Sequence, residues 1–365
     1  MKKELRSLKR RFGDRRRTKI IQAVEVDKGS SSAKGKRKNS SSENKATKKT
    51  DSSGQIPLIS SEPMPENAIV QITTEEKIFW RHQDNIANQP VIKSNTDLIT
   101  YQQITSPKQK ELTLLFSSGK AYPLAIDKIS GYPTKNNIGS LVSNSATQNS
   151  AQVVNYLNLA NQDEKSKSSL LLLTGGGYIK RISFKELDGL GNRGFQLIKL
   201  KNKDHLGYGL PIAENEEIAI ATNGGRILRY QVTEDKIPTM GKSAQGTVGI
   251  KLRYGEKLIG CEKVDKQTIL LLLSQFGYAR LLPIKNIRKI RMGELGNQAF
   301  RFKNKEDKLL KIMVVDPKDK IILETNNNDR HIFDLSKLST TNNNEKQIVK
   351  LAKYDQLSLA VKWWG

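Results

Sequence analysis

Lysine and arginine side chains recur at corresponding places along much of this 365-residue chain. One cation on a surface is usually only solvated, but cations that recur in phase on a repeated structure can bind a row of phosphates. The candidate residues are Lys180, Arg181, Arg193, Lys199, Lys201, Arg226, Arg229, Lys242, Lys251, Arg253, Arg280, Lys285, Arg288, Lys289, Arg291, Arg301 and Lys303. Their spacing predicts an extended polyanion-binding track.

The positive charge is not confined to one end of the chain. The sequence holds 62 Lys and Arg against 37 Asp and Glu, a net charge of +25, and 44 of the basic residues lie after residue 55. A field of this sign attracts polyanions, of which nucleic acid is the commonest. The alternative is a basic surface that only keeps the protein soluble.

Residue patterns for catalysis are weak. The three histidines, His82, His205 and His331, are scattered and have no cysteine or carboxylate cluster beside them, so we expect no metal site. The segment TGGGYIK from Thr174 lacks the Gly-Lys-Ser/Thr ending of a phosphate-binding loop, and no Gly-x-Ser-x-Gly motif occurs. We expect no cofactor and no catalysis from this chain alone.

The single cysteine, Cys261, excludes an internal disulfide framework and is expected to be a buried strand residue. The sequence has no run of 18 apolar residues and no secretory signal at its start. These features favour the cytoplasm. An Arg-rich start followed by a Ser-rich stretch leaves an organelle transit peptide as the alternative, although Glu4, Asp14 and Glu25 interrupt it.

Short β-strands must position the cations. Six β-rich runs begin at residues 67, 111, 168, 215, 266 and 318, and each has an apolar strand, a turn and a second strand that often carries Lys or Arg. Glycine or asparagine can supply positive φ in these turns, at Gly176, Gly177, Gly224, Gly225, Gly277 and Asn328. This period predicts an all-β protein of six radial blades, with the second-strand cations at a repeated outer position.

Three regions follow from composition. Residues 1–26 predict a short basic helix and turn, residues 27–58 a disordered Lys/Ser-rich linker, and residues 59–365 the β domain. Trp363 and Trp364 near the C-terminus predict a strand that closes the ring, with an exposed partner contact as the alternative.

The third to fifth runs carry a resemblance to a known family. They read LLLLTGGGYIKRISFKEL from Leu170, IAIATNGGRILRYQVTEDKIPTMGKSAQGTVGIKLRYGEKLIG from Ile218 and LLLLSQFGYARLLPI from Leu270. These segments resemble the C-terminal domain of the A subunit of type IIA DNA topoisomerases, DNA gyrase and topoisomerase IV. The start, ELRSLKRRFGDRRRTKI, resembles the end of the cleavage core of the same polypeptide.

The resemblance implies a six-bladed β-pinwheel whose neighbouring blades exchange strands and whose basic rim binds and bends double-stranded DNA. It also implies two protein partners, a cleavage core and an ATPase B subunit, with ATP and magnesium used in those other parts of the enzyme. The catalytic tyrosine region of this isomerase family would lie upstream of residue 1, and no membrane or small-molecule substrate is expected.

One family feature is missing. The Gln-Arg-Arg-Gly-Gly-Lys-Gly box of gyrase is replaced by HQDNIANQPVIKSNTDLITYQ after Arg81, and its nearest remnants are GLGNRGFQ from Gly189 and GELGNQAFRF from Gly293. This departure favours topoisomerase IV or a degenerate paralogue and leaves full gyrase-type wrapping in doubt. A basic β-propeller that binds protein is the alternative function.

Overall fold

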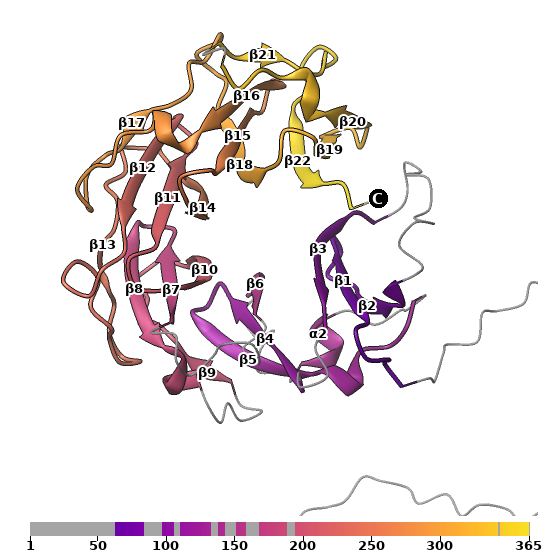
Figure 1. The fold of residues 1–365 in the computed structure, drawn as a ribbon, viewed down its shortest axis with the longest axis vertical. Coiled ribbons are helices and arrows are strands. Elements are labelled where there is room, and N and C mark those ends of the chain that lie inside the picture. Colours follow the sequence, from indigo (N-terminus) through magenta and orange to yellow (C-terminus); the bar gives the residue numbers. More distant parts are fainter. Residues whose placement is uncertain are drawn as a thin grey trace, which may run out of the picture. The chain divides into compact units, whose positions relative to one another are not determined.

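The computed structural model describes residues 63–83, 97–105, 110–132, 138–142, 151–157, 168–187, 194–341 and 344–364. All of them belong to one compact unit that spans residues 56–365. In this unit six antiparallel sheets are arranged as blades around an axis, which confirms the predicted all-β, six-bladed, propeller-like fold (Figure 1). The predicted basic helix and linker lie outside the described residues.

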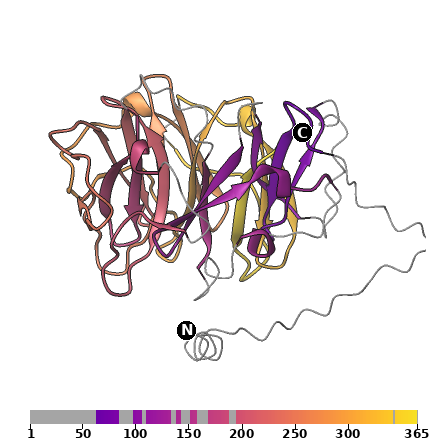
Figure 2. The same ribbon diagram turned by 90° about the horizontal axis from the view of Figure 1, so that it is seen from below.

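Each blade has an inner strand near the axis, a middle strand and an outer strand, which run across the ring between its two faces (Figures 1 and 2). Blade 1 consists of β1 (Ile69–Thr73), β2 (Ile78–Arg81) and β3 (Ile99–Ile104). Blade 2 consists of β4 (Glu111–Phe116), β5 (Lys120–Ala125), β6 (Val153–Leu157) and β9 (Phe195–Gln196). Blade 3 consists of β7 (Ser169–Thr174), β8 (Tyr178–Ser183), β10 (Leu206–Ile212) and β13 (Thr247–Val248).

The other three blades repeat this order. Blade 4 consists of β11 (Glu217–Thr222), β12 (Arg226–Gln231), β14 (Leu258–Val264) and β17 (Asn297–Gln298). Blade 5 consists of β15 (Ile269–Ser274), β16 (Tyr278–Pro283), β18 (Leu309–Val315) and β21 (Lys346–Gln347). Blade 6 consists of β19 (Lys320–Thr325), β20 (Arg330–Asp334) and β22 (Leu357–Lys362). The described helices are the short turns η2 (Ile126–Lys128), α2 (Ile138–Leu141), η3 (Phe184–Leu187), η4 (Ile284–Asn286) and η5 (Leu335–Lys337).

The outermost strand of blades 2 to 5 comes from the next blade. Strand β9 follows β8 of blade 3 in the chain, yet it pairs with β5 of blade 2 through Lys120↔Gln196 and Ala121↔Phe195. Strands β13, β17 and β21 cover β8, β12 and β16 in the same way. Neighbouring blades are therefore linked by backbone hydrogen bonds as well as by packing.

A turn glycine makes each exchange possible. Gly177 has φ +85°, and its carbonyl accepts hydrogen bonds from the backbone N–H groups of Gly249 and Ile250 at 2.9 and 3.2 Å. A Cβ on Gly177 would lie 2.5 Å from the Ile250 carbonyl oxygen, so only glycine suits both the dihedral and the contact. The equivalent glycines of blades 2, 4 and 5 are Gly119, Gly225 and Gly277, with φ between +77° and +80°.

The prediction of positive φ is confirmed at Gly177, Gly225, Gly277 and Asn328. It is wrong for Gly176 and Gly224. A Cβ at those two positions would lie 2.8 Å from an Asp204 oxygen and 2.2 Å from a Glu256 oxygen, so close approach of a carboxylate explains the glycine there.

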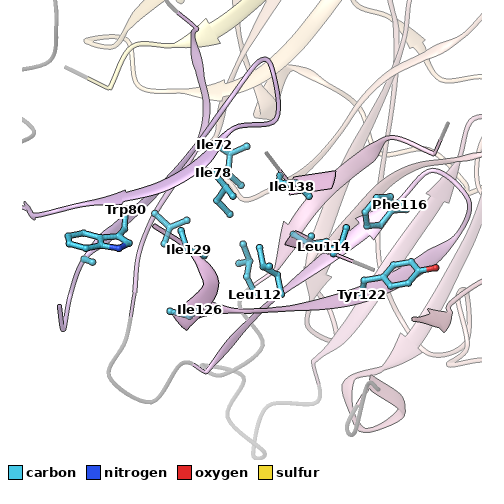
Figure 3. Close-up of a cluster of buried hydrophobic side chains, with 14 residues drawn as sticks. Ile72, Ile78, Trp80, Leu112, Leu114, Phe116, Tyr122, Ile126, Ile129 and Ile138 are labelled. Carbon is cyan, nitrogen blue, oxygen red and sulfur yellow. The ribbon is translucent and has the colours of Figure 1, made fainter. Parts of the chain in front are cut away.

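Apolar residues fill the spaces between blades. Figure 3 shows the cluster between blades 1 and 2, where Ile72 and Ile78 face Leu112 and Leu114. In β15, Leu270 and Leu272 pack toward blade 4, and Leu271 and Leu273 pack toward blade 6. Because both faces of a blade are buried, its middle strand can hold consecutive apolar residues instead of alternating ones, as in SLLLLT of β7 and ILLLLS of β15.

The ring closes through a small contact between blades 6 and 1. Leu98, Ile322 and Val361 are buried there, with Trp363 packed against them. The backbone N–H of Trp363 also donates to the Lys320 carbonyl at 2.9 Å, so Trp363 lies at the closure, but the closing strand β22 ends at Lys362 and the two tryptophans predicted in it follow it. Cys261 is buried in β14, also as predicted.

Candidate nucleic-acid interface

The cations on the outer strands are covered by other parts of the protein and do not lie on its surface. Lys180 and Arg181 on β8 and Arg226 and Arg229 on β12 are buried, and Arg280 on β16 is half-buried. The prediction that these residues occupy an exposed outer position is wrong. The exchanged strand and loop of the next blade cover them, so β8, β12 and β16 are not the outermost strands of their blades.

Lys180 sits in a cage of backbone carbonyls. Its Nζ donates to the carbonyl of Leu197 at 2.5 Å and to those of Lys242 and Ala244 at 3.2 and 3.4 Å. Burial lowers the pKa of Lys180 to about 8. The ammonium group therefore ties the segment exchanged onto blade 2 to the one exchanged onto blade 3.

The buried arginines pair with carboxylates. Arg181 contacts Glu214 at 2.8 Å and Glu234 at 2.5 Å. Arg229 contacts Glu217 at 2.7 Å and also donates to the carbonyls of Ile284 and Ile287 in blade 5.

Arg226 and Glu256 form the most buried ion pair among the described residues that bear on this interface. Their side chains are 3% and 8% exposed, and Arg226 donates through both Nε and Nη2 to the Glu256 carboxylate. Its Nη1 donates to the Leu295 carbonyl of the segment exchanged onto blade 4. Such paired and satisfied groups hold the blades together and offer little charge to a ligand.

The other predicted cations are exposed. They lie on or next to the segments that carry the exchanged strands, which we call the exchange segments and define as residues 194–201, 237–253, 287–303 and 344–353. The exposed predicted cations are Lys199, Lys201, Lys242, Lys251, Arg253, Lys285, Arg288, Lys289, Arg291, Arg301 and Lys303. Arg193 lies outside the described residues.

Backbone contacts join successive exchange segments around the rim. The N–H of Lys199 donates to the Ala244 carbonyl at 3.2 Å, and that of Lys251 donates to the Glu294 carbonyl at 3.1 Å. The N–H of Arg301 donates to the Glu345 carboxylate at 2.9 Å. Lys199, Lys251 and Arg301 occupy equivalent positions in the repeat. Each directly follows two residues that contact the turn glycine of the blade that their exchange segment covers.

Some exposed cations are held by neighbouring side chains. The Nζ of Lys201 lies 3.8 Å from the centre of the Tyr178 ring, and that of Lys242 lies 3.8 Å from the centre of the Phe195 ring. Lys289 pairs with Glu217 at 2.5 Å. Aromatic contacts of this kind leave the positive charge in place for a ligand, whereas the Glu217 pair reduces it at Lys289.

The predicted set omitted three exposed lysines of the fourth exchange segment, Lys346, Lys350 and Lys353. Lys350 follows Ile348 and Val349 as Lys199 follows Leu197 and Ile198, so its position in the repeat is a signal that could have identified it. The rim thus carries equivalent cations on four consecutive exchange segments.

Within the described ranges, no three His, Cys, Asp or Glu side chains come together as metal ligands. No helix in the described part of the chain is long and apolar enough to cross a bilayer.

Six blades, four of which have an exchanged outermost strand, and cations along the rim define a strand-exchanging β-propeller, or β-pinwheel. Residues 168–206, 216–265 and 268–316 match the family described as DNA gyrase C-terminal domain, beta-propeller. Over these repeats the chain is similar to the C-terminal domains of gyrase and topoisomerase IV A subunits.

Curated relatives show the same similarity. The chain is 29% identical over 265 residues to the A subunit of DNA topoisomerase 4 from Synechocystis sp., an alignment that covers 70% of this chain and 28% of the relative. It is 25% identical over 312 residues to the A subunit of DNA gyrase from Borrelia hermsii, covering 82% of this chain and 34% of the relative. The chain therefore spans about a third or less of the length of these relatives.

Solved structures share the fold. The crystal structure of the C-terminal domain of DNA topoisomerase IV aligns with a TM-score of 0.67 at 16% identity, covering 81% of this chain and 93% of that one. The structure of the DNA gyrase A C-terminal domain aligns with a TM-score of 0.61 at 20% identity, covering 82% of this chain and all of that one.

Proposed function

We propose that this chain is a DNA-binding and DNA-bending C-terminal domain of a type IIA topoisomerase A subunit. The observation that carries the proposal is the row of equivalent exposed cations Lys199, Lys251, Arg301 and Lys350 on exchange segments that follow one another around the rim. A duplex that follows this row must curve, because the blades are arranged around an axis.

The energies favour many phosphate contacts over a few. Bending 20 to 30 base pairs through 40 to 90° costs on the order of 1 to 6 kcal/mol. If six to ten phosphates are neutralised, affinity falls roughly 10³- to 10⁵-fold between 50 and 200 mM salt. We expect this steep dependence, with little preference for base sequence.

Salt titration of the full chain on a duplex tests the proposal. Replacing Lys251 and Arg301 together by alanine should lower the slope of log affinity against log salt by about 1.8, since each lost phosphate contact contributes about 0.9. The matched control replaces Lys266 and Lys318, two exposed lysines on the loops that join inner to middle strands, and should leave the slope unchanged. A wild-type slope near zero would refute DNA binding along the rim.

Bending requires a separate measurement. Relaxed circular DNA that is bound by the full chain and then nicked and resealed should change its linking number if the duplex wraps around the ring on a non-planar path. Retardation of DNA without a change in linking number would indicate binding without wrapping.

The partners of the proposed function are double-stranded DNA, a cleavage core and an ATPase B subunit. Cleavage and ATP hydrolysis, with their magnesium, belong in this proposal to those other parts. A protein-binding β-propeller is the second candidate, and only the first candidate should bind DNA with the salt dependence given above.

A further inference from the structure

Four β-turns at equivalent positions end the exchange segments. In each turn the fourth N–H donates to the first carbonyl, at distances of 3.0 to 3.2 Å. We call them tip turns; they are 201–204, 253–256, 304–307 and 352–355. Their two central residues are Asn202 and Lys203, Tyr254 and Gly255, Lys305 and Glu306, and Lys353 and Tyr354.

An acidic residue at the fourth position fixes three of these turns to the hairpin turn of the same blade. Asp204 accepts from the Gly176 N–H at 2.8 Å, and Glu256 accepts from the Thr222 hydroxyl at 2.9 Å. Asp307 accepts from the Phe276 N–H at 3.1 Å. These hydrogen bonds hold three of the four tip turns in place, and with them the backbone of their central residues.

Two tip turns present a tyrosine that the protein leaves uncovered. Tyr254 is 107% exposed and Tyr354 is 90% exposed, the highest values among the described large apolar and aromatic side chains. Single exposed apolar residues are ordinary on a surface, but a ring with no protein cover contributes nothing to the core.

The backbone at Tyr354 adds a second observation. Its φ is +68°, a left-handed conformation that a bulky side chain rarely adopts. The equivalent position in blade 4 is Gly255, with φ +73°, and the tyrosine there stands one residue earlier. Blade 6 thus keeps a strained aromatic residue where glycine would relieve the backbone, and strain of this kind is often retained at functional positions.

Cations precede both tyrosines in the sequence. Lys251 and Arg253 precede Tyr254 within three residues, and the chain can span at most about 11 Å over that distance. Lys350 and Lys353 precede Tyr354 by four residues and by one, and the Lys353 Nζ lies 5.0 Å from the centre of its ring. A partner that meets these rings must therefore be anionic and also present an apolar surface.

We propose that Tyr254 and Tyr354 are wedge residues that contact the bases of a bent duplex through its minor groove while the neighbouring cations hold the flanking phosphates. This inference rests on the proposed function. Proteins that bend DNA commonly insert an apolar side chain between base steps, which partly unstacks the step and kinks the duplex, and the tyrosine ring supplies such an apolar surface. Bases offer the apolar surface, and phosphates offer the negative charge.

The test separates aromatic contact from phosphate contact. The full chain, Tyr254→Ala/Tyr354→Ala, Tyr254→Phe/Tyr354→Phe and the tip-turn control Asn202→Ala are titrated with a fluorescent duplex of about 40 base pairs across about 50 to 200 mM salt. Energy transfer between dyes at the duplex ends reports bending. Thermal melting checks folding, which should not change because both side chains are exposed.

The alanine variant should bind at least about 5-fold more weakly per tyrosine, the lower end of what aromatic contact with bases supplies. Its salt plot should stay parallel to that of the wild type, since no phosphate contact is lost, and its energy transfer should fall. The phenylalanine variant and Asn202→Ala should match the wild type.

Two results overturn the inference and are distinguishable from failure of the proposed function. If the wild type binds the duplex and the alanine variant matches it in affinity and bending, the tyrosines are not wedges and a protein partner becomes the alternative. If the alanine variant changes the slope, the tyrosines act by holding their neighbouring cations. Only a wild type that fails to bind DNA removes the proposed function itself.

Discussion

Replacing Arg226 by methionine should destabilise the ring without changing the charge available to DNA. Arg226 is one of the cations that the repeat pattern assigns to the rim, yet its side chain is 3% exposed and its donors reach Glu256 and the Leu295 carbonyl. The variant therefore separates a structural role from a ligand-binding one.

The magnitude follows from what the substitution leaves behind. Methionine fills much of the arginine volume, but Glu256 is then a buried carboxylate that keeps only the Thr222 hydroxyl and the Arg253 N–H as donors, at 2.9 and 2.8 Å. Removing one partner of a buried ion pair costs about 3 to 5 kcal/mol. We expect the free energy of unfolding to fall by about that amount.

Urea unfolding measures the change as a lower midpoint at an unchanged slope. The double variant Arg226→Met/Glu256→Gln should regain part of the loss, because the uncompensated charge is gone and the amide oxygen can still accept from Arg253. Arg253→Met is the matched control, since this side chain is exposed, and it should be close to wild type in stability.

Acid provides an independent check on the same pair. Burial alone would raise the pKa of Glu256, but the Arg226 hydrogen bond and those from Arg253 and Thr222 lower it below its ordinary value of 4.5. In the wild type this stabilisation is present above pH 4.5 and is lost as pH falls through the lowered pKa. In Arg226→Met burial should raise the pKa instead, so the stability difference between the two proteins should shrink on acidification.

DNA binding by the folded variant decides the interpretation. The slope of log affinity against log salt should match the wild type, since Arg226 contributes no exposed charge. If Arg226→Met is as stable as the wild type but has a smaller slope of log affinity against log salt, Arg226 contacts phosphate and the buried ion pair does not stabilise the blade.

Two further predictions concern the exchange itself. Gly177→Ala should lower the free energy of unfolding by about 1 to 3 kcal/mol, because φ is +85° and the new Cβ would lie 2.5 Å from the Ile250 carbonyl; Gly241→Ala, with open space around it, is the control in the same urea experiment. For Lys180→Met, urea unfolding across pH should show the wild type losing stability relative to the variant as pH falls from about 10.5 to about 8, because burial lowers the pKa of Lys180 in the folded chain. In that window the unfolded chain binds a proton that the folded chain has released, and a constant difference would show that Lys180 titrates normally.

The repeat of apolar runs and turns was enough to predict six blades from the sequence. A run such as Leu270 to Leu273 is apolar at every position because both of its faces are buried between blades, and this pattern is typical of a central strand. Turn residues with positive φ, as at Gly177, located the hairpins.

The position of the strand cations could not be predicted in the same way. The strands that cover them, such as β9 (Phe195–Gln196), are two residues long, which is too short for a period-2 pattern to be recognised. The sequence pattern of a basic residue in a strand is also the same whether its side chain faces solvent or backbone carbonyls. Lys180 faces backbone carbonyls. The partner of the buried Arg226 is a glutamate thirty residues away in the sequence, before the inner strand of the same blade.

The buried and exposed cations act together in the proposed function. A row of charges bends a duplex only if the segments that carry it keep their relative positions; otherwise part of the contact energy is used to order them. Lys180 and Arg226 each bond to the exchange segment that covers their own blade, through the carbonyls of Lys242 and Leu295. Loss of either anchor should therefore let its segment move with its exposed lysines still present, so that the affected variant still binds phosphate but bends DNA less.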